Sequence, residues 1–264
     1  MDARQMLDAG KLGAAIEQLN QEVRAHPADA KLRSFLFETL CFAGDYDRAQ
    51  RQLDILGELD AKAGGAAPTY RNALIAERAR LAVATEGQLP VFLLEPPPFA
   101  ALNLAALHHL HEGKVGEARE LLLEAIDAQP ATPGKIDGQP FAEFADADPF
   151  LGPFLEVIIE ARYIWVPFVQ IRRFTIEAPR RLRDLFWTEG SLETIHGPSG
   201  RVLLPVLYAG SFRHPDEHVC LGRATEWEDI GEKLVRGRGQ RMFLADEVEK
   251  PMLQCRQVEF EAGD

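Results

Sequence analysis

The carboxylates of Asp146 and Asp148 are the feature of this 264-residue chain whose residue types and spacing most directly suggest chemistry. Two carboxylates in one turn could hold a Mg²⁺ ion or divide the roles of general acid and general base. Acids at this spacing are also common in loops, and Pro149 after Asp148 is typical of a turn. A catalytic or anion-binding site here would draw on further charges of the C-terminal half, namely Arg183, Asp184, Arg223 and Arg241. The same charges could equally form a buried ion-pair network that stabilises the fold.

A second candidate is a group of imidazoles and one carboxylate near residue 110. His108, His111 and Glu112 would lie on one helical face, where they could meet a transition metal. The spacing is not that of an HExxH motif, because Val115 stands in the place of the second histidine. We therefore interpret these residues as a solvated helix end.

Two other loops contain residue types that occur in catalytic or anion-binding sites. Residues 237–241 (GRGQR) could present backbone N–H groups and two guanidinium groups to an anion, but they lack the Lys-Ser/Thr of a P-loop. A turn whose arginines pair with carboxylates is the alternative. Ser211, His214 and Asp216 are the residue types of a hydrolase triad, yet they lie too close in one loop to form its geometry readily. We predict no catalytic residue, metal or cofactor.

Composition and charge restrict the class of protein. The formal net charge is -12, with 29 Lys and Arg against 41 Asp and Glu, which argues against a nucleic-acid partner. The three cysteines, Cys41, Cys220 and Cys255, are far apart and in no zinc-binding spacing, as expected for reduced thiols. No signal peptide is recognisable, and no apolar run approaches the roughly 20 residues of a membrane span. We expect a cytoplasmic protein without membrane insertion.

The N-terminal half contains a repeated triplet of Gly, Ala and Leu within apolar residues at helical spacing. The first two copies are 34 residues apart, which is the period of tetratricopeptide (TPR) repeats. The Gly permits a sharp turn between antiparallel helices, the Ala lets them approach, and the Leu fills the gap one turn later. The copies are Gly10, Ala15 and Leu19; Gly44, Ala49 and Leu53; and Gly113, Ala118 and Leu122.

Helical repeats of this kind stack into a curved surface that binds peptides or helices of other proteins. In the TPR register, one set of side chains faces the concave side of the array. An ordinary solvated or partly packed helix face is the alternative. The residues of this predicted partner-binding set are Lys31, Ser34, Glu38, Asn103, Leu107 and Leu110.

The C-terminal half changes to strand spacing. Leu155, Val157 and Ile159 alternate with Glu156 and Glu160 before the aromatic and β-branched stretch 163–166, which predicts a β-hairpin that turns near residues 161–162. Further strands are predicted at 182–187, 202–208, 218–221 and 258–261, and helices at 169–174 and 227–234.

The predicted fold class is therefore α+β in two parts. A TPR-like helical repeat domain covers residues 1–130, a turn-rich linker follows over 131–140, and a compact, β-rich α+β domain covers 141–264.

Several ordered motifs in the second half carry a family resemblance. They are Asp146, Asp148, Leu151, Gly152, Pro153, Leu155 and Glu156; residues 163–168 (YIWVPF); residues 182–185 (LRDL) and Trp187; Leu204-Pro205, Leu207-Tyr208 and Gly210-Ser211; residues 221–227 (LGRATEW); and residues 239–241 (GQR). With these motifs the chain resembles the ImpE/SciE-type accessory proteins of type VI secretion systems, also called TagJ. Phe144 stands where that family often has Trp, and Phe150 where a basic residue is common.

The resemblance implies a cytoplasmic, non-enzymatic adaptor. Its partners would be the small subunit of the contractile sheath, bound through that subunit's N-terminal helix, and the ClpV-type AAA+ ATPase that disassembles contracted sheaths. A helical-repeat surface is suited to receive an amphipathic helix. The alternative is an enzyme or an anion- or metal-binding protein that uses Asp146, Asp148, Arg223 and Arg241.

Overall fold

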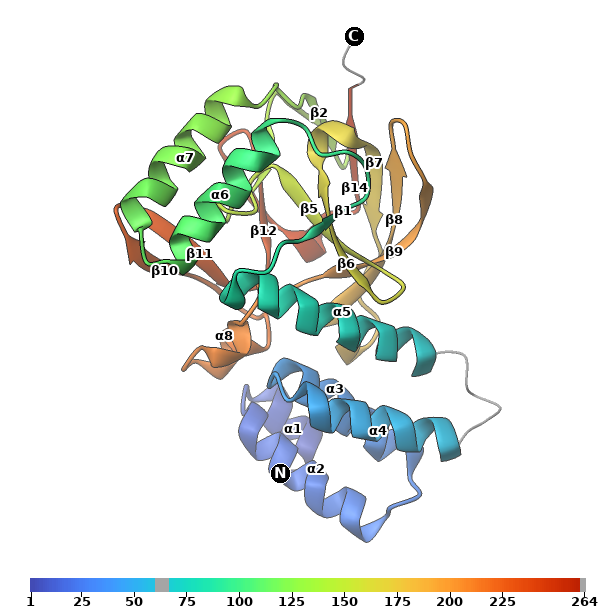
Figure 1. The fold of residues 1–264 in the computed structure, drawn as a ribbon. Helices are drawn as coiled ribbons and strands as arrows, with labels where there is room; N and C mark the ends of the chain where they lie inside the picture. The colour runs from blue at the N-terminus through green and yellow to red at the C-terminus, as the bar shows by residue number, and fades with distance from the viewer. Residues whose placement is uncertain (60–66, 262–264) are drawn as a thin grey trace.

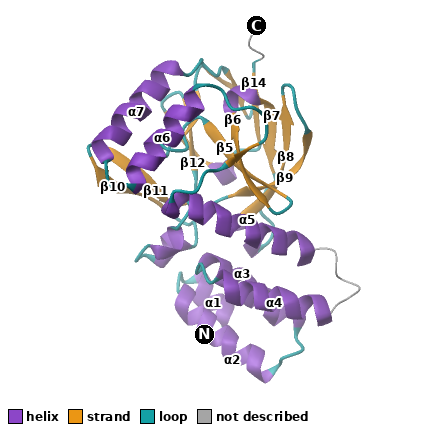
Figure 2. Ribbon diagram, viewed as in Figure 1, coloured by secondary structure: helices purple, strands orange, loops and turns teal. Residues whose placement is uncertain are grey.

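The computed structural model describes residues 1–59 and 67–261. Helices dominate the N-terminal half and strands the C-terminal half (Figure 1, Figure 2). The chain is thus α+β, with helices first and a β-rich part second, as the sequence predicts. No helix in these two ranges is both long and apolar enough to cross a bilayer.

The first four helices form two antiparallel hairpins. They are α1 (Ala3–Asp8), α2 (Leu12–Ala25), α3 (Ala30–Phe42) and α4 (Tyr46–Leu59). Asp2 caps the start of α1 in a capping box with Gln5, and the Asp29 side chain accepts from two backbone N–H groups at the start of α3. Helix α2 ends at Ala25, with His26 as its C-cap residue.

The repeated triplets occupy equivalent positions in three helical hairpins. Each Gly turns the chain between two helices with a positive φ, of 75°, 68° and 75°, a conformation that only Gly adopts without penalty. Each Ala is fully buried where the second helix packs on the first, and each Leu is buried one turn later. The three hairpins are α1/α2, α3/α4, and the pair formed by α6 (Phe99–His111) and α7 (Val115–Ala128).

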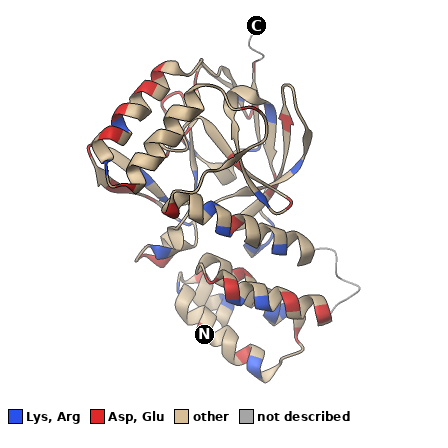
Figure 3. Ribbon diagram, in the orientation of Figure 1, with Lys and Arg blue, Asp and Glu red and all other residues tan. Residues whose placement is uncertain are grey.

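The third hairpin does not continue the stack formed by the first two. Helix α5 (Ala67–Glu86) runs across the middle of the molecule, and α6 (Phe99–His111) and α7 (Val115–Ala128) lie beyond it, beside the sheets (Figure 1). Helix α6 is uncharged along its whole length, whereas α7 carries several acidic residues (Figure 3). Assignment of these hairpins to the TPR class stays a prediction.

A nine-stranded sheet forms the centre of the second half, in the order β1-β6-β5-β9-β8-β7-β14-β2-β3. The predicted hairpin is confirmed as β5 and β6, which turn at Glu160 and Ala161. Two strands, β2 and β3, lie in or next to the stretch 131–140 and extend the sheet through β14. The strands are β1 (Val91–Phe92), β2 (Gly134–Ile136), β3 (Gln139–Phe141), β5 (Phe154–Ile159), β6 (Arg162–Pro167), β7 (Ile171–Ile176), β8 (Trp187–Thr194), β9 (Ser199–Pro205) and β14 (Gln257–Phe260).

Two smaller sheets and one short helix complete the fold. One sheet has the order β13-β12-β4 and the other is the hairpin β10-β11. Their bounds are β4 (Phe144–Asp146), β10 (Thr225–Gly231), β11 (Leu234–Gly239), β12 (Met242–Ala245) and β13 (Val248–Pro251), and the helix is α8 (Glu217–Cys220).

The helix predicted at 169–174 is wrong. A three-residue 3-10 turn precedes β7, and Ile171 and Phe174 are both buried although they are three residues apart. The register of β7 against β8 shifts between Ile171 and Arg173, so a β-bulge places both apolar residues on the buried side and imitates helical spacing.

Three further local predictions also differ from the structure. The helix predicted at 227–234 is the hairpin β10-β11, whose turn at Glu232 and Lys233 has positive φ and interrupts the alternation of a strand. The strand predicted at 218–221 is α8, because Asp216 caps it by accepting from the His218 N–H. The stretch 182–185 is a 3-10 turn rather than a strand.

One continuous apolar core joins the two halves. It includes Leu36 and Phe42 of α3 together with Phe154 of β5 and Trp187 of β8. Phe42 packs edge-on against Phe186, with 5.2 Å between ring centroids. The helices therefore pack directly on the β-rich part.

A second core lies on the other side of the nine-stranded sheet and is rich in phenylalanine. Phe144 is at its centre, 5.0 Å from the ring of Phe168 and 5.2 Å from that of Phe243. An aromatic ring is thus required at this position, consistent with either Phe or Trp.

The turn glycines Gly44 and Gly113 provide a matched test of the contact between the helical half and the β-rich half. A Cβ on Gly44 would lie 2.5 Å from the Phe212 ring, whereas one on Gly113 meets nothing within 4 Å. Both positions have positive φ, so alanine at either should lower the free energy of unfolding by about 1 to 2 kcal/mol through backbone strain. Because the added methyl group must displace Phe212, Gly44→Ala should lower the free energy of unfolding by at least about 1 kcal/mol more than Gly113→Ala does. Urea unfolding of both variants checks this, and equal losses would contradict the contact.

Candidate functional site

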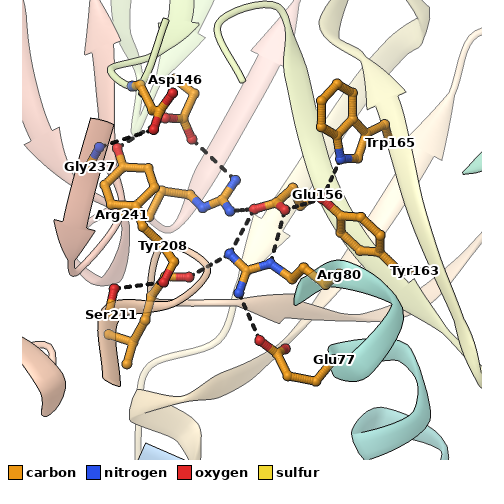
Figure 4. Close-up of polar contacts among 12 residues, drawn as sticks. Glu77, Arg80, Asp146, Glu156, Tyr163, Trp165, Tyr208, Ser211, Gly237 and Arg241 are labelled. Carbon is orange, nitrogen blue, oxygen red and sulfur yellow. Dashed lines mark hydrogen bonds and ion pairs between the residues drawn. The ribbon is translucent and has the colours of Figure 1, made fainter. Parts of the chain in front are cut away.

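Asp146 and Arg241 of the predicted charged site meet in a cluster with Glu156 and two residues of α5, sealed between that helix and the sheets (Figure 4). We define the buried ion cluster as Glu77, Arg80, Asp146, Glu156 and Arg241. Each of these residues is at most 3% exposed. Charges this far from water are stable only when they are paired and hydrogen-bonded.

Arg80 of α5 connects the helical half to the sheet. Its guanidinium donates two parallel hydrogen bonds of 2.9 Å to the carboxylate of Glu156 on β5, a third of 2.9 Å to Glu77, and a fourth to the Leu207 carbonyl. Burial lowers the pKa of Arg80, but the charge and hydrogen bond of Glu77, together with Tyr163 and Tyr46, raise the pKa above its ordinary value. Arg80 is therefore held in its charged form.

The remaining lone pairs of the two glutamates are also used. The other oxygen of Glu77 accepts from the Trp187 indole N–H at 3.1 Å. Glu156 accepts from the Tyr163 hydroxyl, which in turn accepts from the Trp165 indole N–H. Burial raises the pKa of Tyr163, so this hydroxyl keeps its proton.

Arg241 joins Asp146 to Glu156. Its guanidinium lies 3.1 Å from the Asp146 carboxylate and contacts that of Glu156 as ion pairs rather than as well-directed hydrogen bonds. Asp146 Oδ1 also accepts from the Asp148 N–H at 2.9 Å and the Tyr208 hydroxyl at 3.0 Å. Burial raises the pKa of Asp146 to about 6, while Arg241 opposes the rise. Burial also lowers the pKa of Arg241 to about 10.

Asp148 is paired next to the cluster. One oxygen accepts from the Phe150 N–H at 3.0 Å, and the other accepts from Arg236 at 2.9 Å and from the Gly237 N–H at 3.0 Å. The loop 237–241 therefore does face an anion, but the anion is an internal carboxylate. At Phe150, where the family resemblance led us to expect a basic residue, the Arg236 guanidinium covers the phenyl ring at 4.9 Å.

The cluster has no room for a substrate. The two cavities that touch it have volumes of ≈ 10 and ≈ 20 Å³, about the space of a single water molecule. In the part of the chain that the structure describes, no three His, Cys, Asp or Glu side chains are placed to hold a metal ion. The arrangement is thus suited to fixing α5 and the loops against the sheet.

Three other charged candidates of the alternative site lie outside the cluster. Arg183 lies 3.6 Å from Glu38 and covers the Tyr70 ring at 4.7 Å. The Asp184 carboxylate accepts from two backbone N–H groups of its own loop. Arg223 donates to the Asp8 carbonyl at 2.9 Å. The six charges proposed for one site therefore occupy two different places.

The loop and helix-end candidates do not form catalytic or metal sites either. His111 faces the Ala84 carbonyl of α5 at 3.2 Å, away from the His108 and Glu112 pair. The Ser211 hydroxyl donates to the Tyr208 carbonyl and accepts from the Gly239 N–H. His214 pairs with Glu226 at 3.2 Å, and Asp216 caps α8.

The predicted partner-binding residues fall into two separate groups. Lys31, Ser34 and Glu38 of α3 line an open groove of ≈ 970 Å³, which we call the cationic groove. The groove lies between α1 and α3 on one side and the stretch 179–185 on the other. Its lining residues are Arg4, Leu7, Asp8, Lys31, Ser34, Phe35, Glu38, Pro179, Arg180, Arg181, Leu182, Arg183, Leu185 and Arg223.

The second group lies on α6. Asn103 and Leu107 are 2% and 4% exposed, and Leu110 is partly buried against the same core. These side chains therefore pack inside the molecule. Arg180 and Arg181 of the groove were not among the predicted residues, although the basic run PRRLR at 179–183 could have indicated them.

Comparison with known proteins identifies the family. A family model described as "ImpE protein" matches residues 138–259. A relative from Pseudomonas aeruginosa, the type VI secretion system accessory component TagJ, is 42% identical over 264 residues, which is 100% of this chain and 92% of the relative. The chain belongs to the ImpE/TagJ family. The crystal structure of protein VPA1032 from Vibrio parahaemolyticus has the same fold, with a TM-score of 0.90 at 24% identity over 98% of this chain and 97% of that chain.

The motifs by which the ImpE/TagJ family was recognised meet in and around the buried ion cluster. Asp146, Asp148 and Glu156 belong to one motif, Tyr163 to the next and Arg241 to the last. Although they are up to 95 residues apart in sequence, they are connected through direct contacts. The motifs of this ImpE/TagJ chain thus mark a structural centre.

Removal of Arg80 tests the contribution of the cluster to stability. Arg80→Met leaves the Glu77 and Glu156 carboxylates buried without their main partner, and we expect a loss of about 3 to 5 kcal/mol in the free energy of unfolding. The control is Arg78→Met on the same helix, since Arg78 pairs at the surface with an Asp47 side chain that is 81% exposed. Arg78→Met should lower the free energy of unfolding by less than about 1 kcal/mol. Similar losses in both variants, measured by urea unfolding, would contradict the role of Arg80.

The raised pKa of Asp146 predicts a pH dependence. Its folded pKa of about 6 lies above the ordinary value of 3.8, so its stabilising effect is complete below about pH 4 and is lost as the pH rises through 6. The stability of Asp146→Asn relative to the native chain should therefore rise by about 3 kcal/mol between pH 4 and pH 7. Denaturant unfolding across this range measures the difference. Asp127→Asn on exposed α7 is the control, and a pH-independent difference for Asp146→Asn would contradict the assignment.

Proposed function

We propose that this ImpE/TagJ chain is a non-enzymatic, cytoplasmic adaptor of a type VI secretion system. It binds the N-terminal helix of the small contractile-sheath subunit and assists or tunes recruitment of the ClpV-type AAA+ ATPase. The observation that carries the proposal is the full-length match to a type VI secretion system accessory component. The partners themselves come from the family resemblance seen in the sequence motifs.

The geometry of the acidic residues supports an adaptor more than an enzyme. Asp146 and Asp148 are buried, capped by backbone N–H groups and paired with arginines. A general acid or base must reach its substrate, and a metal site needs open coordination positions. The alternative site also required Arg223, which lies at the cationic groove instead.

The α3 residues of the predicted set are the proposed place of helix docking. Lys31, Ser34 and Glu38 line the cationic groove, and a helix can bind by placing one face in such a groove. Asn103 and Leu107 would act only indirectly, because they fix α6 inside the molecule. The proposed docking site is therefore α3 with the facing stretch 179–185.

Calorimetric titration tests the proposed partner. The full chain is titrated with a peptide that spans the N-terminal helix of the small sheath subunit, and saturable binding is expected. Ser34→Trp, which fills the groove, should weaken binding at least about tenfold. Ser199→Trp on the exposed end of β9 is the matched control and should leave the affinity unchanged. No binding by the native chain would overturn the partner assignment.

A further inference from the structure

The cationic groove concentrates positive charge in an otherwise acidic protein. Six of its fourteen lining residues are Lys or Arg and only two are acidic, whereas the whole chain has a net charge of -12. Its cations come from four separate parts of the sequence, which are α1, α3, the stretch 179–183, and Arg223. Such a local reversal of sign attracts a negatively charged ligand.

Most of this charge is not neutralised internally. Among the described residues, only Arg183 of the six makes an ion pair, at 3.6 Å to Glu38. Arg4 instead covers the Phe35 ring at 5.5 Å, and Arg223 donates to a backbone carbonyl. The cations without a carboxylate partner in residues 1–59 and 67–261 are Arg4, Lys31, Arg180, Arg181 and Arg223.

The stretch 179–185, which forms the arginine-bearing wall of the groove, is held in place by contacts within the fold. The Asp184 carboxylate accepts from the backbone N–H groups of Arg180 and Arg181 at 2.8 and 2.9 Å. Arg183 packs over the Tyr70 ring, and its buried Nε has no hydrogen-bond partner in the described part of the chain. Phe186, three residues after Arg183, packs on Phe42 of α3. A preformed wall loses little conformational entropy when a ligand binds.

The groove also has an apolar component. Leu7, Phe35, Leu182 and Leu185 line it alongside the charges and pack against the main core. A ligand that fits must therefore carry both carboxylates and an apolar stripe. A free anion would leave these apolar side chains uncovered.

We propose that the cationic groove binds an acidic amphipathic helix of a partner protein, with carboxylates on either side of an apolar stripe. The inference rests on the proposed function, because it names the chemistry of the segment that the adaptor receives. Nucleic acid fits less well, since the chain as a whole repels a polyanion and Phe35 is covered by Arg4 rather than open for base stacking. The flanking acids Asp8 and Glu38 likewise oppose a dense polyphosphate.

The test uses the full chain and a labelled helical peptide of about 15 residues that has leucines three and four residues apart and glutamates on both flanks. The same peptide with every Glu replaced by Lys is the charge control. Fluorescence anisotropy should show binding of the Glu peptide only. The double variant Lys31→Glu/Arg181→Glu should weaken it at least about tenfold, whereas Arg51→Glu, an exposed cation of α4 outside the groove, should not.

The outcomes separate this inference from the proposed function. If the native chain and the double variant bind the sheath-subunit peptide equally well, the groove is not the docking site. The proposed adaptor function would then still stand. Groove-dependent binding of the Glu peptide without any binding of the sheath peptide would support the groove and overturn the partner. Equal binding of the Glu and Lys peptides would overturn the charge argument. Groove-dependent binding of single-stranded DNA or anionic vesicles that displaces the Glu peptide would overturn the choice of ligand.

Discussion

The pairing of buried charges is the constraint on which the rest of this structure depends. Arg80 and Glu156 lie on different halves of the molecule, and neither can leave water without the other. Their bidentate contact fixes both the distance and the orientation of α5 relative to β5. Arg241 then extends the same requirement to Asp146, so that α5, β4, β5 and the segment before β12 must assemble together.

This requirement gives the motif residues of the cluster a structural role. A buried carboxylate tolerates few substitutions, because a neutral residue leaves its arginine unpaired and a lysine reverses the charge. Asp148 shows the principle at its simplest, since Arg236 and the Gly237 N–H occupy one of its oxygens. Even Gly237 is restricted, because a Cβ there would lie 2.3 Å from the Tyr208 ring.

The sequence predicted the elements that follow from the spacing of nearby residues. It did not predict the contacts between residues that are far apart in the chain. Helices α2 to α4 and the hairpin β5-β6 follow from apolar periodicity, and the turn glycines from their repeat. The hairpin β10-β11 was missed because Trp227, Ile230 and Leu234 are spaced like one face of a helix. The pairing of Asp148 with Arg236, 88 residues later, has no local signal. The predicted residues of α3 line the cationic groove, but its other side comes from the stretch 179–185, which no local pattern places beside α3.

The buried ion cluster and the cationic groove are mechanically connected through one short segment. Trp187 donates to Glu77 in the cluster, and its ring packs edge-on against Phe186 at 4.6 Å. Phe186 in turn contacts Phe42 of α3, and Arg180, Arg181 and Arg183 of the groove lie three to six residues before it in the chain. The cluster therefore sets where the wall 179–185 stands relative to α3, and with it the width of the groove. A structural centre of this kind can hold a surface groove in a preorganised geometry without lining it.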